Sequence, residues 1–390
     1  MNITRFGRPM AAIAMAATAA IALSSCAANE EAAPAEVSTL AGSLVGAGAS
    51  SQGSAQEAWI AAFQTANPDV TITYDPSGSG AGRETFIAGG SNFAGSDSYL
   101  KDEELALPFA ACAAGTLPFE VPAYISPIAV IYNVDGVTDL NLDASTIAKI
   151  FSGAITNWND AAIVALNPKA KLPDLAITAV HRSDDSGTTK NFSDYLFQTA
   201  KADWAIEKPA DPFPFQTGEG AQGTSGVVDA VKNGTGTIGY ADASKAGKLS
   251  VANIKVGDKF IKYTPEAAAA VVADGSVVEG RDASDMAIKI DRTTTDATHY
   301  PIVLVSYLIG CNEYAEAGVA DLVKPYFEYI LSEQGQADAA ASAGSAPLDA
   351  ATSKKALAIV SAIKLHPLMP GLGNLQDSLG RALPNSLNLQ

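Results

Sequence analysis

Two spacings of apolar residues alternate along this chain, one typical of strands and the other typical of helices. Runs rich in Val, Ile and Tyr predict buried strands at 70–74, 128–132, 177–180 and 302–308. Apolar residues three or four positions apart predict helices near Trp59 and Phe63, near Phe192 and Leu196, and near Val227 and Val231. Because strands and helices follow one another, we expect an α/β fold with largely parallel sheets.

The length of the chain and one ambiguous segment bear on its organisation. The chain has 390 residues, more than one hydrophobic core usually organises, so two domains are expected. The apolar run 267–272 suits a short helix and equally a strand flanked by turns. The pattern of the sequence leaves that choice open.

Residues 1–25 have the pattern of an export signal. Arg5 and Arg8 provide a basic start, and the apolar run 10–23 is shorter than the roughly 20 residues that span a bilayer. The string Leu23-Ser24-Ser25-Cys26 resembles the lipobox of bacterial lipoproteins, in which the cysteine carries the lipid. We therefore predict a lipid anchor that holds the protein at the extracytoplasmic face of a bacterial cell membrane. An ordinary secretory signal with an incidental cysteine is the alternative.

The three cysteines divide into one assigned to the membrane anchor and two others. Cys26 is followed by a stretch rich in Ala, Glu and Pro, which predicts a flexible tether over 26–39. Cys112 and Cys311 remain, and thiols outside the cytoplasm are usually oxidised, which favours a disulfide bond between them. Two separate buried thiols are the alternative.

The charge balance of the chain is strongly acidic. It contains 25 Lys and Arg against 42 Asp and Glu, a net charge of −17 at pH 7. An acidic surface repels phosphate backbones, and no cluster of Lys or Arg stands out, so nucleic acid is not an expected partner. Taken alone, the charge would favour cationic partners, but the loops of the chain point to an anion.

Three short loops rich in Gly, Ser and Thr each join an apolar run to a predicted helix. They cover 46–51, 77–82 and 182–188, and the third begins with Arg182. A fourth segment, 93–97, is a turn of small residues that ends in a carboxylate. The start of a helix offers unpaired N–H groups and the positive end of its dipole, and glycine lets the backbone approach an anion closely. One such loop would be explained as a helix cap, whereas three together with an arginine favour an anion site.

The four loops, in this order, resemble those of the phosphate-binding proteins (PstS) of phosphate ABC importers. The segments that carry the resemblance are Leu44-Val-Gly-Ala-Gly-Ala-Ser50, Tyr74-Asp-Pro-Ser-Gly-Ser79, Phe93-Ala-Gly-Ser-Asp97 and Val180-His-Arg-Ser-Asp-Asp-Ser-Gly-Thr188. The resemblance extends over roughly 42–345. It implies a monomer with two α/β lobes, joined by crossing strands and holding the ligand in the cleft between them. The implied lobes are 40–124 with 300–390, and 125–299.

The resemblance also implies roles for individual residues in that cleft. The implied phosphate-binding residues are Ser50, Ser51, Ser79, Asp97, Arg182, Ser186, Gly187 and Thr188. Their hydroxyl and backbone N–H groups would donate to phosphate oxygens, with Arg182 as the single cation and Asp184 holding its guanidinium group. Asp185 stands where a small residue is common in the family, and the resemblance does not predict the effect of this departure.

Asp97 is the one acceptor implied among these donors. An ionised carboxylate only accepts hydrogen bonds, and phosphate keeps a proton at neutral pH that it can donate in a short charge-assisted bond. Sulfate has no such proton, so the same contact becomes a clash of like charges. The resemblance therefore implies selectivity for phosphate over sulfate.

Together these features predict binding of inorganic phosphate outside the cytoplasm and its delivery to the permease subunits of an ABC transporter, with no enzymatic activity, cofactor or metal. The alternatives are a binding protein for sulfate or molybdate, a lipoprotein that keeps the lobes without a ligand, and a secreted Ser-dependent hydrolase. The hydrolase is disfavoured because the chain has no Gly-x-Ser-x-Gly motif, and because His181, His299 and His366 lack the spacing of metal ligands.

Overall fold

The computed structural model describes residues 38–365. The predicted export signal 1–25, the predicted lipidation site Cys26 and the tether up to residue 37 lie outside the described residues, as do residues 366–390. Within the described range, no helix is both long enough and apolar enough to cross a membrane.

The first lobe is built on a mixed sheet. Its strands are β1 (Ala41–Gly48), β2 (Asp69–Asp75), β3 (Phe93–Ser96) and β14 (Val303–Cys311). β1 pairs in parallel with β2 and β3, whereas β14 runs antiparallel to β3. We call these strands the first lobe, together with the helical segments η1 (Ser50–Gln52), α1 (Gly53–Ala66), α2 (Ser79–Ile87), α3 (Asp102–Leu105), α9 (Val319–Leu331), α10 (Glu333–Ala343) and α11 (Ala350–Ser361).

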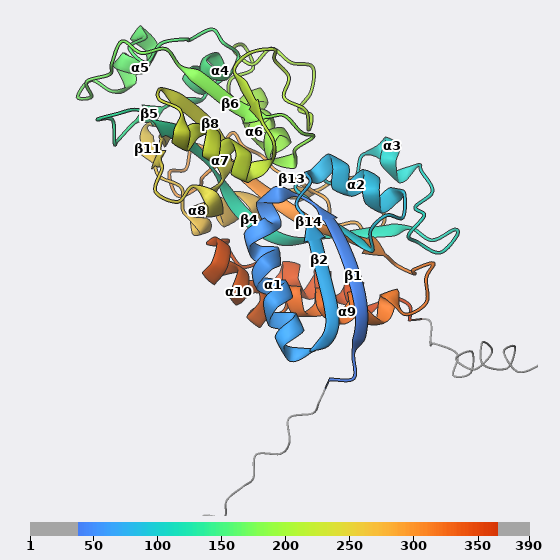
Figure 1. Ribbon diagram of the computed structural model, residues 1–390. Helices are drawn as coiled ribbons and strands as arrows, with labels where there is room; N and C mark the ends of the chain where they lie inside the picture. Colours follow the sequence, from blue (N-terminus) through green and yellow to red (C-terminus); the bar gives the residue numbers. More distant parts are fainter. Residues whose placement is uncertain (1–37, 366–390) are drawn as a thin grey trace, which may run out of the picture. The chain divides into compact units, whose positions relative to one another are not determined.

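Strand β4 (Pro118–Asn133) connects the first lobe with the second. Its residues 118–127 pair with β14, and its residues 128–133 pair with β8 (Thr237–Asp242), both antiparallel. Figure 1 shows β4 running from the strands around β1 toward those around β6. The chain leaves the first lobe along β4 and returns along β14, so these neighbours run in opposite directions.

The second lobe continues the sheet from β8. Its further strands are β6 (Thr178–Arg182), which is parallel to β8, and β7 (Glu219–Ala221), which is parallel to β6. β9 (Ser250–Val251) pairs with β4, and β5 (Asn141–Leu142), β10 (Asn253–Val256) and β11 (Lys259–Ile261) form a separate small sheet. The parallel pairing expected from the sequence is found in β1–β2, β1–β3, β6–β7, β6–β8 and β5–β10, and none of these pairs includes β4 or β14. The helical segments of this lobe are α4 (Ala144–Phe151), α5 (Ala161–Leu166), α6 (Gly187–Thr199), α7 (Gly223–Asn233) and η2 (Ala243–Lys245).

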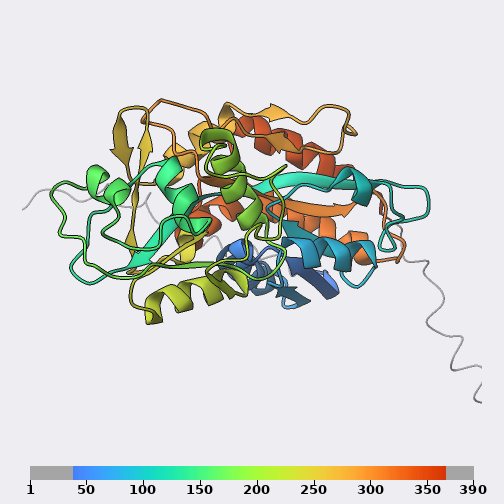
Figure 2. The same ribbon diagram turned by 90° about the horizontal axis from the view of Figure 1, so that it is seen from above.

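Between the small sheet and β14 the chain forms α8 (Pro265–Ala273) and a small pair of strands, β12 (Ser276–Val277) and β13 (Ile288–Lys289). The ambiguous apolar run is thus helical. Its start is fixed locally, because the side chain of Thr264 accepts a hydrogen bond from the N–H of Ala267 at 3.1 Å and proline follows at the first helical position. Seen from above, the blue and red segments from the two ends of the described chain gather apart from most of the green ones (Figure 2).

Aromatic side chains anchor the sheet of each lobe to its helices. In the first lobe the ring of Phe93 lies 5.5 Å from that of Phe327, edge to face. In the second lobe the ring of Phe192 stacks on that of Tyr240 at 4.2 Å. Phe93 begins β3 and Phe192 lies in the second turn of α6, so this packing fixes the two segments that meet at the cleft.

Cys112 and Cys311 form the predicted disulfide bond. Their Cα atoms lie 5.2 Å apart although 199 positions separate them in sequence. The bond joins the turn after α3 to the last residue of β14, so it lies within the first lobe.

Candidate anion-binding site

Asp97 follows β3 directly and is almost fully buried, with 4% of its surface exposed. Three hydroxyl groups donate hydrogen bonds to its carboxylate. Ser51 Oγ and Ser306 Oγ each lie 2.6 Å from Oδ1, and Thr188 Oγ1 lies 3.0 Å from Oδ2. Ser51 and Ser306 belong to the first lobe and Thr188 to the second, so the carboxylate lies where the two lobes meet.

The backbone of Asp97 also binds both lobes. Its N–H donates to Ser79 Oγ at 3.1 Å, and its carbonyl oxygen accepts from Asn191 Nδ2 at 2.8 Å. Gly187 approaches so closely that a Cβ atom there would lie 2.6 Å from both Asp97 Cβ and Ser79 Oγ. Because even alanine would clash at this position, the contact between the lobes depends on glycine.

Three helical segments begin at this contact. η1 begins at Ser50 and leads into α1, α2 begins at Ser79, and α6 begins at Gly187. Ser186 caps α6, because its Oγ accepts from the N–H of Thr189 at 3.2 Å. The first N–H groups of a helix have no partner within the helix, and the dipole places partial positive charge there. The three starts therefore bring N–H donors and hydroxyls toward one place.

Arg182 ends β6 and supplies a buried cation, with 2% of its surface exposed. Its Nε donates to Asp184 Oδ1 at 2.7 Å, and its Nη2 contacts the other carboxylate oxygen. The N–H of Gly223 also donates to Asp184 Oδ1, at 3.0 Å. Burial alone would raise the pKa of Asp184, but the hydrogen bonds and charge of Arg182 lower it, so this carboxylate stays ionised and holds the guanidinium group.

The pKa of Asp97 is shifted in the opposite direction. Burial raises it, and this effect outweighs the hydrogen bonds from Ser306, Ser51 and Thr188 and the charge of Arg182, which all lower it. Neutral hydroxyl groups stabilise the carboxylate less than a paired cation would. The side chain of Asp97 is therefore able to share a proton with a ligand.

The remaining predicted residues lie at the edge of this arrangement. Ser50 Oγ lies 2.9 Å from Thr224 Oγ1 and accepts from the N–H of Thr224 at 3.0 Å, so it contacts the start of α7 rather than Asp97. The carbonyl oxygen of Asp185, whose effect was not predicted, accepts from the N–H of Gly80 at 2.9 Å and adds a backbone contact between the lobes.

Three residues at the site were not predicted from the sequence: Ser306, Asn191 and Thr224. Ser306 could have been singled out from the sequence, because it is the one small polar residue in the apolar strand run 302–308. Its Oγ accepts from Gln52 Nε2 at 2.7 Å, which directs its own hydrogen toward Asp97. Asn191 and Thr224 lie on helices among other polar residues, where nothing in the sequence distinguishes them.

A second buried cluster joins the lobes beside this site. Arg83, on α2, donates to Asp211 Oδ2 at 2.8 Å and to Glu104 at 3.0 Å. Ser98 Oγ donates to Asp211 Oδ1, and Lys101 Nζ lies 3.3 Å from Asp211 Oδ2. Burial would raise the pKa of Asp211, but the charge of Arg83 and these contacts lower it to about 2. In the described part of the chain, no group of three His, Cys, Asp or Glu side chains is placed to hold a metal ion.

The chain is similar to known proteins both in its superfamily domain and, more specifically, in its family. Residues 33–334 match the PBP superfamily domain, and the fold is that of a two-lobed solute-binding protein. The chain is 34% identical over 346 residues to phosphate-binding protein PstS 3 of Mycobacterium leprae, covering 85% of this chain and 92% of that protein. It is 32% identical over 372 residues to phosphate-binding protein PstS2 of Mycobacterium bovis, covering 92% of this chain and 100% of that protein. The chain therefore belongs to the PstS family of phosphate-binding proteins.

A solved structure supports the fold. The periplasmic phosphate-binding protein PfluDING, bound with phosphate, superimposes with a TM-score of 0.66 at 20% identity, covering 84% of this chain and 100% of that one. The expected two-lobed α/β fold is thus confirmed.

Proposed function

We propose that this protein binds inorganic phosphate between its two lobes, outside the cytoplasm, and delivers it to the permease subunits of an ABC transporter. One observation carries the proposal: hydroxyls from both lobes converge on the buried Asp97, close to a buried arginine and three helix starts. An oxyanion that loses its water needs many donors in compensation, and this arrangement offers them from several directions. Membership of the PstS family supports the same ligand.

The proposed phosphate ligands divide between the lobes. Those of the first lobe are Ser50, Ser51, Ser79 and Asp97, and those of the second are Arg182, Ser186, Gly187 and Thr188. Hydroxyl groups rotate, so the hydrogens of Ser51 and Thr188 can turn from Asp97 to a phosphate oxygen. Arg182 contributes the charge while Asp184 fixes its direction, which limits the entropy lost when phosphate binds.

Asp97 provides the proposed selectivity. It accepts the proton that phosphate retains, whereas a fully ionised oxyanion would meet a buried negative charge. A site built around such a bond rejects an analogue that lacks it by roughly 10⁴ or more.

Calorimetry of the Asp97→Asn variant tests this function. The amide can donate to an oxyanion, so we expect weaker phosphate binding together with measurable sulfate binding. Asp258→Asn is the matched control, because Asp258 is exposed on the turn between β10 and β11. Unchanged phosphate affinity and unchanged rejection of sulfate in Asp97→Asn would contradict the role of Asp97, and absence of phosphate binding by the wild type would contradict the function.

We further propose that Cys26 carries a lipid that anchors the protein to the extracytoplasmic face of the membrane. The lipobox-like string before it supports this proposal. Comparison of the masses of the mature wild type and of the Cys26→Ser variant tests it. If the two masses do not differ by the lipid group, the proposed anchor is wrong.

We also propose that the lobes are bounded as the resemblance implies, at 40–124 with 300–390 and at 125–299. The change of pairing partner within β4 between Pro127 and Ile128 supports the first boundary. Hydrogen exchange with and without phosphate tests the boundaries, because closure should alter protection at these crossing points and leave the strands outside them unchanged.

A further inference from the structure

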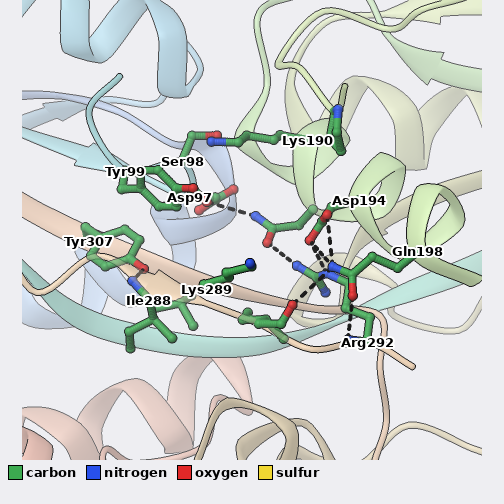
Figure 3. A pocket seen from close by; sticks show the side chains of 14 residues that line it. Asp97, Ser98, Tyr99, Lys190, Asp194, Gln198, Ile288, Lys289, Arg292 and Tyr307 are labelled. Carbon is green, nitrogen blue, oxygen red and sulfur yellow. Dashed lines mark hydrogen bonds and ion pairs between the residues drawn. The ribbon is translucent and has the colours of Figure 1, made fainter. Parts of the chain in front are cut away.

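A cavity of about 230 Å³ adjoins Asp97 (Figure 3). Its walls come from the first lobe, the second lobe and the segment that runs back toward β14. The lining residues used below are Tyr99, Lys190, Asn191, Asp194, Lys289 and Arg292. Asp97 also lines it, whereas the proposed phosphate donors Ser51, Ser79 and Arg182 do not, so the cavity adjoins the proposed phosphate site and shares Asp97 with it.

Lys190 places a positive charge at this cavity. It lies on α6, and its ammonium group is 4.2 Å from the centre of the Tyr99 ring of the first lobe. Among the described residues its ammonium group makes no ion pair, and the aromatic ring cannot neutralise it. The pKa of Lys190 is lowered, because burial and the charge of Arg83 outweigh the charges of Asp211, Asp194 and Glu120, which raise it. Three carboxylates therefore act on this ammonium group without forming an ion pair with it, and burial still disfavours its charge.

Lys289 provides a second positive charge at the same cavity. It is the last residue of β13 and is exposed, and it makes no ion pair with any described residue. Figure 3 shows Lys190 and Lys289 extending into the space between the labelled side chains. Two ammonium groups thus reach one cavity from different elements.

The other charged groups of the cavity are satisfied by the protein. Arg292 Nε donates to Asp194 at 2.7 Å, and Arg292 also donates to Asn191 Oδ1 and to the carbonyl oxygens of Pro301 and Val303. The carboxylate of Asp97 accepts hydrogen bonds from three hydroxyl groups and is the other anion of the lining beside Asp194. The lining therefore holds three cations, Lys190, Lys289 and Arg292, against the two anions Asp97 and Asp194, and Lys190 and Lys289 are the cations without an ion pair among the described residues.

We propose that this cavity is a second binding site for a small oxyanion such as phosphate or sulfate, held by Lys190 and Lys289. Its lining comes from both lobes, so its occupant binds the closed arrangement better than an open one. By linkage, the occupant strengthens phosphate binding at the first site, and phosphate strengthens binding of the occupant. Lys190 and Lys289 only donate hydrogen bonds, so they do not require a protonated ligand, and sulfate serves as the probe for this site. The inference rests on the proposed phosphate function, because phosphate affinity is its readout.

The experiment measures phosphate affinity by calorimetry while chloride is replaced by sulfate at constant ionic strength. We expect sulfate to tighten phosphate binding by the wild type about fivefold, a typical size for coupling between sites. Lys190→Met keeps the apolar stem but removes the charge, and Lys289→Met does the same at the other wall, so each should lose most of the tightening. Lys201→Met is the matched control, because Lys201 is also a lysine packed over an aromatic ring, that of Phe197 at 4.8 Å, and should keep it. Thermal unfolding verifies that each variant is folded.

The outcomes separate this inference from the proposed function. If sulfate leaves phosphate affinity unchanged or weakens it, or tightens it equally in Lys190→Met, Lys289→Met and Lys201→Met, the second site is wrong while phosphate binding stands. If the wild type does not bind phosphate in chloride, both proposals are wrong. A second, weaker phosphate isotherm at high phosphate that disappears in Lys190→Met would identify phosphate itself as an occupant.

Discussion

Asp97 and Asp211 are both buried carboxylates at contacts between the two lobes, yet their surroundings differ in kind. Asp97 receives hydrogen bonds from three neutral hydroxyl groups, and its pKa is raised. Asp211 is paired with the buried guanidinium group of Arg83, and its pKa is lowered to about 2. The difference shows how one residue type serves two purposes: Asp211 holds the lobes together as a permanent anion, whereas Asp97 is free to share a proton with a ligand.

The largest effect is expected from removing the cation of the Asp211 cluster. Arg83→Met leaves the buried carboxylate in contact with Ser98 and the partly exposed Lys101, with the charge of Lys190 acting on it as well. Breaking a buried ion pair in this way should lower the free energy of unfolding by about 3–5 kcal/mol, as measured by urea denaturation. Lys101→Met removes the exposed partner of the same carboxylate and should cost at most about 1 kcal/mol. Equal losses of unfolding free energy in Arg83→Met and Lys101→Met would show that the buried cation stabilises the protein no more than the exposed one.

The acid dependence of stability should distinguish the two aspartates by sign. The pKa of Asp211 is about 2 in the folded protein against 3.8 ordinarily, so its contribution is present above pH 3.8 and is lost as pH falls through about 2. This contribution amounts to about 2 kcal/mol. The pKa of Asp97 is raised, so its contribution has the opposite sign: it is present below the ordinary pKa of Asp and is lost as pH rises.

Urea denaturation between pH 7 and pH 2 measures both contributions. Asp211→Asn should show a shallower loss of stability in acid than the wild type, and Asp97→Asn should show a steeper one. If the stability of the two variants fell equally with pH, the pKa shifts of Asp97 and Asp211 would not have opposite directions.

The smallest effect is expected from removing one hydroxyl donor of Asp97. Ser306→Ala leaves Ser51 as the remaining donor to Oδ1, while Gln52 keeps the carbonyl oxygen of Tyr307 as a partner. Loss of one hydrogen bond to a charged group should weaken phosphate binding by about 1–2 kcal/mol, or roughly 5- to 30-fold, in calorimetry. Ser276→Ala, on the exposed strand β12, is the control. An unchanged phosphate affinity in Ser306→Ala would remove Ser306 from the site.

The local chemistry of the loops was readable from the sequence, and so were the strands that lead into them. Residues 303–308 of one apolar run lie in β14, where every residue is buried, and the run at 70–74 lies in β2, where buried and exposed residues alternate as its apolar and polar residues do. The run at 267–272 was undecidable because alanine and valine carry no clear period there. A cap and a proline just before it settle the helix, together with packing against β4 and β14.

The convergence of the loops could not be predicted from spacing or composition, and came only from resemblance to a family. Ser306 contacts Asp97 across 209 positions of sequence, and this distance is closed by the pairing of β14 with β3. Arg83 and Asp211 likewise meet only because the lobes do. Pairs of this kind are set by topology, whereas helix caps and strand runs are set by neighbours in sequence.

The disulfide bond of the first lobe has a topological consequence for the second. Cys112 and Cys311 close a covalent ring, and every strand and helix of the second lobe lies on that ring. The second lobe thus lies on a covalently closed loop, and the disulfide is at the end of the β4–β14 pair opposite to the crossing between the lobes. A single protease cut anywhere between the two cysteines would give fragments that still migrate as one molecule until the bond is reduced. The bond also keeps the two chain segments of the first lobe covalently joined after such a cut.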